Sequence, residues 1–204
     1  MSDTLKMDVI MGIGVNNGAS AGENTVIGGN STDRALMSFL MDCKVSEQIA
    51  LADVRQFNAF NSTKKTSSVT ITHDGRAITY LKGAPERLLD RCVSYIDENG
   101  ETKPLTEKNY LSSYINEQAG RSMRLLAVAK TEGADENSEQ LTLVCVLSIR
   151  DNVRKEAADA IREVQNAGIQ VVMVTGDRKE TAVAIAKEAG LLKDKTDVAL
   201  TSAE

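Results

Sequence analysis

A tight turn between two strand-like segments constrains the fold of this chain most strongly. Residues 66–72 and 76–82 are rich in β-branched and apolar residues, and His73-Asp74-Gly75 joins them. Asp-Gly is typical of hairpin turns because it supplies the positive φ angles that such a turn requires. The two segments are therefore predicted to pair as an antiparallel hairpin. The histidine, the only one in the chain, is expected to be a solvated turn residue, since no nucleophile and carboxylate pattern accompanies it.

The second of these strands runs directly into Lys82–Glu86, which has the sequence KGAPE. Proline is well suited to a first helical turn, and apolar residues then recur at helical spacing, so a helix is predicted from Pro85 to Cys92. The junction offers a lysine ammonium, a glycine that lets a ligand approach the backbone, and a helix N-terminus with free N–H groups. These features suit an anion, although an ordinary strand-to-helix turn explains the same residues.

Other elements in the first 150 residues follow from periodicity and turn residues. Further strands are expected over residues 54–61, 124–129 and 141–149, with a polar loop over 131–140. A helix beginning at Ser31 has an apolar face composed of Ala35, Leu36, Phe39, Leu40 and Cys43. A second amphipathic helix is expected between Thr106 and Gly120. Residues 1–28 are predicted to form a loop with one edge strand at Val9–Met11.

The pattern changes near residue 150. A helix over Lys155–Ala167 is followed by the apolar run Ile169–Val174 and then by a second helix that ends at Gly190. A continuously apolar strand between helices is typical of a parallel sheet that is buried on both faces. We therefore expect an α/β (α+β) chain: a mainly antiparallel sheet flanked by helices in residues 1–150, then a partial Rossmann-like parallel unit in residues 151–204. So short a second unit is expected to be a piece of something larger.

Composition excludes several classes of protein. The net charge of −5 and the absence of a basic block argue against nucleic acid as a partner, and only 3% of residues are aromatic. The three cysteines, Cys43, Cys92 and Cys145, are far apart and are expected to be buried, reduced thiols, not a zinc site. No apolar run approaches the roughly 18 residues of a spanning helix, and no secretory signal is expected.

Five motifs, taken in chain order, resemble those of P-type cation-transporting ATPases. They are Gly29–Leu36, Phe60–Val69, Lys82–Glu86, Asp151–Arg154 and Val174–Asp177. The resemblance covers essentially the whole chain and is greatest to calcium-pump-like members. It implies a nucleotide-binding domain in residues 1–150 and part of the HAD-like phosphorylation domain in residues 151–204.

The resemblance also implies an ATP site. Phe60 would stack on adenine, Lys82 and Gly83 would line the nucleotide cleft, and Lys65 and Arg124 would lie on the phosphate side. A flat apolar ring suits a base, and cations suit a polyphosphate. Without the resemblance, the same residues are explained by a core phenylalanine on a strand and by solvated cationic side chains.

Further residues acquire roles only through the resemblance. Asn30 stands where calcium pumps of the reticulum type carry a glutamate that contacts the adenine amino group, and its carbonyl oxygen can accept the same hydrogen bond. Arg154 would lie in the hinge between the two domains. Thr175, Gly176 and Asp177 would form the loop that meets the phosphoryl group, at the carboxyl end of the predicted parallel strand.

The pumps that this chain resembles form an aspartyl phosphate at an Asp-Lys-Thr-Gly motif. Here Asp194-Lys195-Thr196 is followed by Asp197 and lies in a charged tail, so we interpret it as a chance match. The chain alone is therefore expected to bind ATP weakly, with a Kd on the order of millimolar, and to do no chemistry. Mg²⁺ and the transported cation are expected to bind only the intact pump, and no metal site is expected here.

The expected partners follow from the same resemblance. They are ATP, the remainder of the phosphorylation domain, an actuator domain and transmembrane helices, so the chain would be a cytoplasmic part of an integral membrane protein. Two alternatives stay open: a soluble HAD-like phosphatase, which needs a nucleophilic aspartate at a strand end, and a non-catalytic interaction module that retains the fold.

Overall fold

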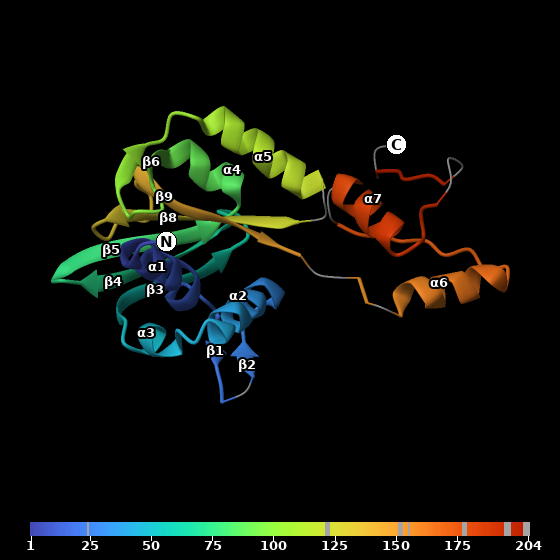
Figure 1. The fold of residues 1–204 in the computed structure, drawn as a ribbon, viewed down its shortest axis with the longest axis horizontal. Helices are drawn as coiled ribbons and strands as arrows, with labels where there is room; N and C mark the ends of the chain where they lie inside the picture. Colours follow the sequence, from blue (N-terminus) through green and yellow to red (C-terminus); the bar gives the residue numbers. More distant parts are fainter. Residues whose placement is uncertain are drawn as a thin grey trace. The chain divides into compact units, whose positions relative to one another are not determined.

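The computed structural model describes residues 1–23, 25–120, 123–150, 153–154, 156–176, 179–193 and 197–201. The chain divides into two compact units (Figure 1). The first comprises Met1–Asn109 with Leu125–Ile149, and the second comprises Tyr110–Arg124 with Arg150–Glu204. Among the described residues, no helix combines the length and apolar character needed to cross a membrane.

A seven-stranded sheet forms the centre of the first unit, in the order β3-β4-β5-β8-β9-β6-β7. Its strands are β3 (Asp53–Asn61), β4 (Thr66–His73), β5 (Arg76–Gly83), β6 (Cys92–Ile96), β7 (Thr102–Pro104), β8 (Arg124–Glu132) and β9 (Leu141–Ile149). Neighbours β3–β4, β4–β5, β5–β8 and β6–β7 pair antiparallel, whereas β6 and β9 pair parallel. The prediction of a mainly antiparallel sheet is confirmed.

The hairpin predicted from Asp-Gly is present between β4 and β5. Asp74 and Gly75 have φ angles of 49° and 76°, and His73 pairs with Arg76 to close the turn. Two successive positive φ angles match the twist of the flanking strands, which is why this dipeptide fixes the register. The imidazole of His73 is exposed, as predicted.

Helices cover one face of this sheet and close the main core. They are α1 (Asp3–Ile10), a π-helical segment (Met11–Val15), α2 (Ser31–Asp42) and α3 (Ser46–Ala50), and a two-stranded ribbon of β1 (Ala19–Ala21) and β2 (Val26–Gly28) accompanies them. Ile13 from the π-helical segment, Leu36 from α2 and Val128 from β8 are all buried in one hydrophobic cluster.

The edge strand predicted at Val9–Met11 is wrong, because these residues belong to α1 and the π-helical segment. Ser2 caps α1 by accepting a hydrogen bond from the Leu5 N–H at 3.2 Å. A Cβ added at Gly12 would lie 2.3 Å from Cγ1 of Val128, so the glycine lets the helical backbone approach the sheet closely. Gly12 therefore serves helix-to-sheet packing within a helical segment, not a loop.

Helix α2 forms as predicted, but its buried face differs from the predicted one. Buried positions are Asp33, Leu36, Met37 and Leu40, whereas Ala35, Phe39 and Cys43 are exposed. The periodicity is helical in both cases, but the face that meets the sheet is rotated toward Met37. Cys43 is exposed and Cys145 is only partly buried, which corrects the expectation of three buried cysteines; all three are free thiols.

The helix predicted from Pro85 to Cys92 is shorter in the structure. Helix α4 spans Pro85–Leu88, a 3₁₀ turn spans Leu89–Arg91, and Cys92 already begins strand β6. The reason is that Cys92 is fully buried and pairs with Leu141 of β9. A turn at Asp97–Gly100 then leads to the short strand β7, which the sequence did not predict.

The second unit contains α5 (Lys108–Gly120, which begins in the first unit), α6 (Ala157–Asn166) and α7 (Lys179–Glu188). The Thr181 hydroxyl donates a hydrogen bond of 3.3 Å to the Ala119 carbonyl, joining α7 to α5. An open cavity of about 880 Å³ is lined by residues 170–176, α7 and residues 197–201.

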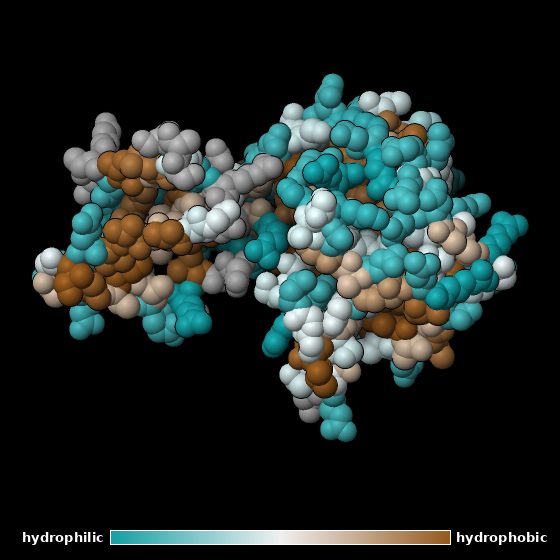
Figure 2. All heavy atoms as spheres, turned by 180° about the vertical axis from the view of Figure 1, so that it is seen from behind, coloured by the Kyte–Doolittle hydropathy of each residue, from teal (hydrophilic) through white to brown (hydrophobic). Residues whose placement is uncertain are grey.

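The parallel strand predicted at Ile169–Val174 is wrong for this structure. These described residues form no strand, and Val172 and Val174 are 70% and 92% exposed. Figure 2 shows apolar side chains gathered on the surface of this unit. A parallel strand requires neighbouring strands for its hydrogen bonds, and the described part of this unit supplies none.

Candidate functional site

The Lys82–Gly83 junction is built into the end of a central strand. In β5, Lys82 pairs with Ser67 of β4 and with Val128 of β8. A Cβ at Gly83 would lie 2.4 Å from the Lys65 carbonyl oxygen and 2.7 Å from Cγ2 of Thr66. Glycine is therefore required here by the close approach of the neighbouring strand, in addition to any space that it leaves for a ligand.

Lys82 is not an open surface cation. Its residue exposure is only 5%, and its Nζ donates a hydrogen bond of 2.8 Å to Oδ1 of Asp33 on α2. Burial lowers the pKa of Lys82, and the hydrogen bond to Asp33 opposes that shift. A buried ammonium beside a single carboxylate is held in a fixed position.

Asp33 is a residue of this site that the sequence did not reveal. Asp33 does not cap α2; Asn30 does, because its Oδ1 accepts a hydrogen bond of 2.9 Å from the Asp33 N–H. The available signal was the spacing of Asp33 with Leu36 and Leu40, which puts an acidic residue on the buried face of α2. A buried carboxylate requires a partner, and Lys82 supplies it.

Phe60 lies on the edge strand β3 with 54% of its surface exposed, so it is not a core phenylalanine. Asn61, the next residue, pairs with Thr66, and Thr66 in turn pairs with Gly83. This register brings the ring-bearing end of β3 and the end of β5 to the same edge of the sheet. An exposed aromatic ring at such an edge can stack on a flat ligand.

Lys65 lies in the turn between β3 and β4 at the same edge. It has a positive φ angle of 56°, and its N–H donates to the Asn61 carbonyl at 2.6 Å. Its ammonium is 3.9 Å from Oε1 of Glu86, with both side chains about half exposed. Such an exposed pair is weak, so Lys65 can turn toward an anion at little cost.

Asn30 is connected to this group of residues by α2, whose Asp33 is bonded to Lys82. As the N-cap of α2 its backbone is extended and its side-chain oxygen is already engaged, so the predicted use of that oxygen for adenine competes with capping. The buried pair of Asp33 and Lys82 joins the start of α2 to the end of β5. The structure therefore brings Phe60, Lys65 and the Lys82–Gly83 junction to one edge and links Asn30 to them.

Other residues predicted for the site belong to the second unit. Arg124, at the start of β8, and Arg154, Thr175 and Gly176 are all exposed there. Asp177 lies outside the described residues, as do Asp151 and the Asp194–Thr196 segment. Within the described ranges, no group of three or more His, Cys, Asp or Glu residues is arranged to hold a metal ion.

Comparison with known proteins identifies the class. The family of the P-type ATPase cytoplasmic domain N matches residues 11–156. This chain belongs to that family, and the sequence-based resemblance is confirmed.

Several proteins of similar sequence are calcium-transporting ATPases. Calcium-transporting ATPase 4, plasma membrane-type, from Arabidopsis thaliana is 35% identical over 205 residues, which cover 94% of this chain and 20% of the relative. Plasma membrane calcium-transporting ATPase 3 from Rattus norvegicus is 35% identical over 188 residues, which cover 83% of this chain and 15% of the relative. Calcium-transporting ATPase PAT1 from Dictyostelium discoideum is 32% identical over 176 residues, which cover 81% of this chain and 16% of the relative. The chain spans no more than about a fifth of these relatives.

Proposed function

We propose that this chain binds ATP as the nucleotide-binding part of a larger P-type ATPase, which couples ATP hydrolysis through an aspartyl phosphate to cation transport. The observation that carries the proposal is the exposed Phe60 ring at the same sheet edge as Lys65 and Gly83. The names of the relatives favour calcium as the cation.

Each residue of this edge has a role that suits its environment. Phe60 stacks on the adenine ring, and Lys65, in its exposed turn, pairs with a phosphate. Lys82, fixed by Asp33, contributes a positioned ammonium to the floor of the site instead of a mobile phosphate ligand. Asn30 donates from its amide nitrogen to the base while its oxygen caps α2.

The remaining residues act in the intact pump. Arg124 contacts phosphates and Arg154 belongs to the hinge between domains. Thr175, Gly176 and Asp177 approach the phosphoryl group, with Mg²⁺ supplied by the parts of the phosphorylation domain outside this chain. The exposed apolar residues of 169–174 are the observation that favours packing of the second unit against those parts. An actuator domain and transmembrane helices complete the parent, of which this chain is a cytoplasmic portion.

Calorimetric titration with ATP tests the proposal. We expect saturable binding with a Kd on the order of millimolar, about −4 kcal/mol. Phe60→Ala should weaken it roughly tenfold or more, because stacking of one base on an aromatic ring contributes about 1–3 kcal/mol. Phe39→Ala is the matched control, since Phe39 and Phe60 are both 54% exposed.

Lys65→Gln probes the phosphate side. Lys44→Gln is its control, because Lys44 and Lys65 are both lysines with positive φ angles, 58° and 56°. Absence of ATP binding would contradict the proposal and favour a non-catalytic interaction module. Phosphate release by this chain alone would favour the soluble phosphatase.

A further inference from the structure

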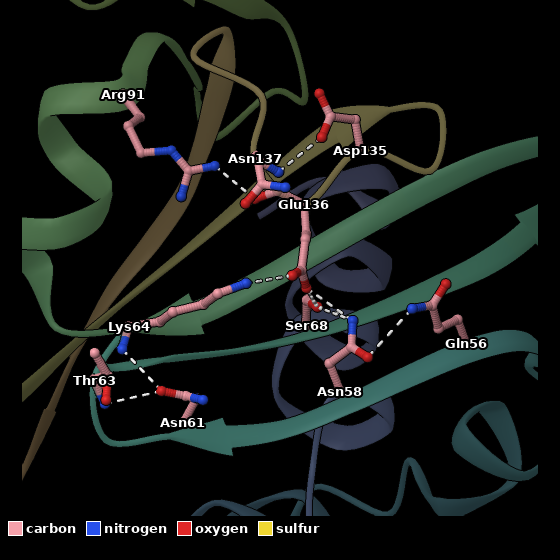
Figure 3. Close-up of polar contacts among 10 residues, drawn as sticks. All are labelled: Gln56, Asn58, Asn61, Thr63, Lys64, Ser68, Arg91, Asp135, Glu136 and Asn137. Atoms are coloured by element: carbon pink, nitrogen blue, oxygen red, sulfur yellow. Dashed lines mark hydrogen bonds and ion pairs between the residues drawn. The ribbon is translucent and has the colours of Figure 1, made fainter.

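Glu136 makes three side-chain contacts around the segment that carries Phe60 (Figure 3). It lies in the loop between β8 and β9, where its Oε1 accepts from Lys64 Nζ at 2.8 Å. Its Oε2 accepts from the Ser68 hydroxyl at 2.6 Å and from Asn58 Nδ2 at 2.8 Å. One carboxylate therefore joins β3, β4 and the turn between them.

The loop that presents Glu136 is itself held in place. Arg91 Nη2 donates to the Glu136 carbonyl at 2.7 Å (Figure 3). It also donates to the Ser138 carbonyl at 2.8 Å. The Arg91 side chain is only 19% exposed, so its guanidinium is a well-packed anchor. Asp135 Oδ1 also accepts from the Asn137 N–H at 2.9 Å. The backbone that carries the Glu136 carboxylate is thus held in place independently of the contacts that the carboxylate makes with β3.

The strand around Phe60 depends on such contacts. The β3–β4 ladder is irregular between Asn58 and Asn61, and Phe60 has no paired residue on β4. Glu136 contacts Asn58, two residues before the ring, and Lys64, four residues after it. Side-chain contacts from Glu136 therefore hold the chain on both sides of an interruption in the ladder.

We propose that Glu136 is a positioning residue for the exposed ring of Phe60, acting through Asn58 and Lys64 without touching the nucleotide. The inference rests on the proposed ATP site. Loss of the carboxylate frees the segment from Asn58 to Lys64, so the ring must be ordered when adenine binds, which weakens binding. The phosphate side, carried by Lys65 and the Lys82–Gly83 junction, is not expected to change.

Glu136→Gln in the full chain tests the role, with Glu132→Gln as the control. Glu132 is an exposed glutamate at the end of β8 and has the same substitution. Circular dichroism and thermal melting first establish that each variant is folded. Amide hydrogen exchange at residues 59–64 should then accelerate in Glu136→Gln and stay unchanged in the control.

Affinities for ATP and for inorganic tripolyphosphate separate positioning from general loosening. We expect Glu136→Gln to weaken ATP binding about fivefold, with tripolyphosphate binding unchanged. In a cycle with Lys64→Met, the double variant should lose less than the sum of the two single losses, because both substitutions remove the same contact.

The outcomes distinguish the two claims. If the unsubstituted chain binds ATP and Glu136→Gln binds it equally well, the positioning role alone is overturned. An equal loss of tripolyphosphate binding would overturn it too, since the effect would then not act through the ring. No ATP binding by the unsubstituted chain would overturn the proposed function and the positioning role together.

Discussion

Asp33 on α2 and Lys82 on β5 form a buried ion pair, with 2.8 Å between Oδ1 and Nζ and side-chain exposures of 13% and 6%. This pair ties the start of α2, capped by Asn30, to the end of the strand that leads into KGAPE. Burial lowers the pKa of this lysine, and the Asp33 carboxylate opposes that shift by replacing part of the lost hydration.

Removal of one partner of this pair should be costly. We expect Lys82→Met to lower the free energy of unfolding by about 3 kcal/mol or more, because it leaves the Asp33 carboxylate buried without its partner. The double variant Lys82→Met/Asp33→Leu should recover much of this loss. Urea unfolding of the unsubstituted chain, Lys82→Met, Asp33→Leu and the double variant measures the coupling energy between the two residues. Strictly additive losses of unfolding free energy would contradict the role of the pair. For this reason, a loss of ATP binding in Lys82→Met alone says little about nucleotide contact.

Gly83→Ala should disturb the β4–β5 ladder. The added methyl group would lie 2.4 Å from the Lys65 carbonyl oxygen, and such overpacking typically costs about 1–3 kcal/mol. The matched control is Gly120→Ala in α5, where nothing lies within 4 Å of the added carbon and alanine favours the helix. Thermal melting should show a lower Tm for the first variant only; equal effects would contradict the close approach.

The three cysteines should differ in reactivity. Cys43 is exposed, whereas burial raises the pKa of Cys92 to about 11 and that of Cys145 to about 12. Alkylation at pH 8 followed by peptide mass spectrometry should modify Cys43 first, because thiolate is the reactive form. Cys92 should react only after unfolding in urea, and the partly buried Cys145 should react more slowly than Cys43. Rapid modification of Cys92 in the folded chain would contradict its burial.

The Glu136 contacts should make stability depend on pH in acid. Its hydrogen bond from Lys64, followed by that from Ser68, holds the pKa of Glu136 below the usual value of 4.5. A lowered folded-state pKa contributes stability that is present above the unfolded pKa and is lost as pH falls through the folded pKa. The difference in unfolding free energy between the unsubstituted chain and Glu136→Gln should therefore be about 1 kcal/mol or less at pH 7. It should shrink below about pH 4.5, and a difference that grows in acid would contradict this assignment.

Local chemistry predicted the hairpin and the start of α2 well. The Asp74-Gly75 turn depends on the φ preferences of two adjacent residues, and the start of α2 depends on nearby capping groups. These constraints act within a few residues, so the sequence is sufficient to read them. The failures at Val9–Met11 and Ile169–Val174 have the opposite origin. The first segment is helical, and Gly12 lets its backbone pack closely on β8. The second segment lacks neighbouring strands among the described residues.

The sequence proposes the residues of the candidate site but does not reveal their environments. Phe60 is exposed as an adenine-stacking ring requires, yet Lys82 proves to be buried against Asp33, a contact between positions 49 residues apart. Glu136 escaped notice because it lies in a polar loop that resembles any solvated connection. Its contacts with Asn58 and Lys64 arise only when the sheet brings β8–β9 and β3–β4 together.

The central claim is that adenine binds against Phe60. Aromatic NMR spectra of the full chain, assigned through Phe60→Leu and Phe39→Leu variants, should be recorded during titration with ATP, AMP and tripolyphosphate. We predict that ATP and AMP shift the Phe60 ring resonances saturably, that tripolyphosphate shifts only the Lys65 region, and that Phe39 stays unchanged. ATP-induced shifts that leave the Phe60 ring unaffected, or no shifts at all at millimolar nucleotide, would contradict the account.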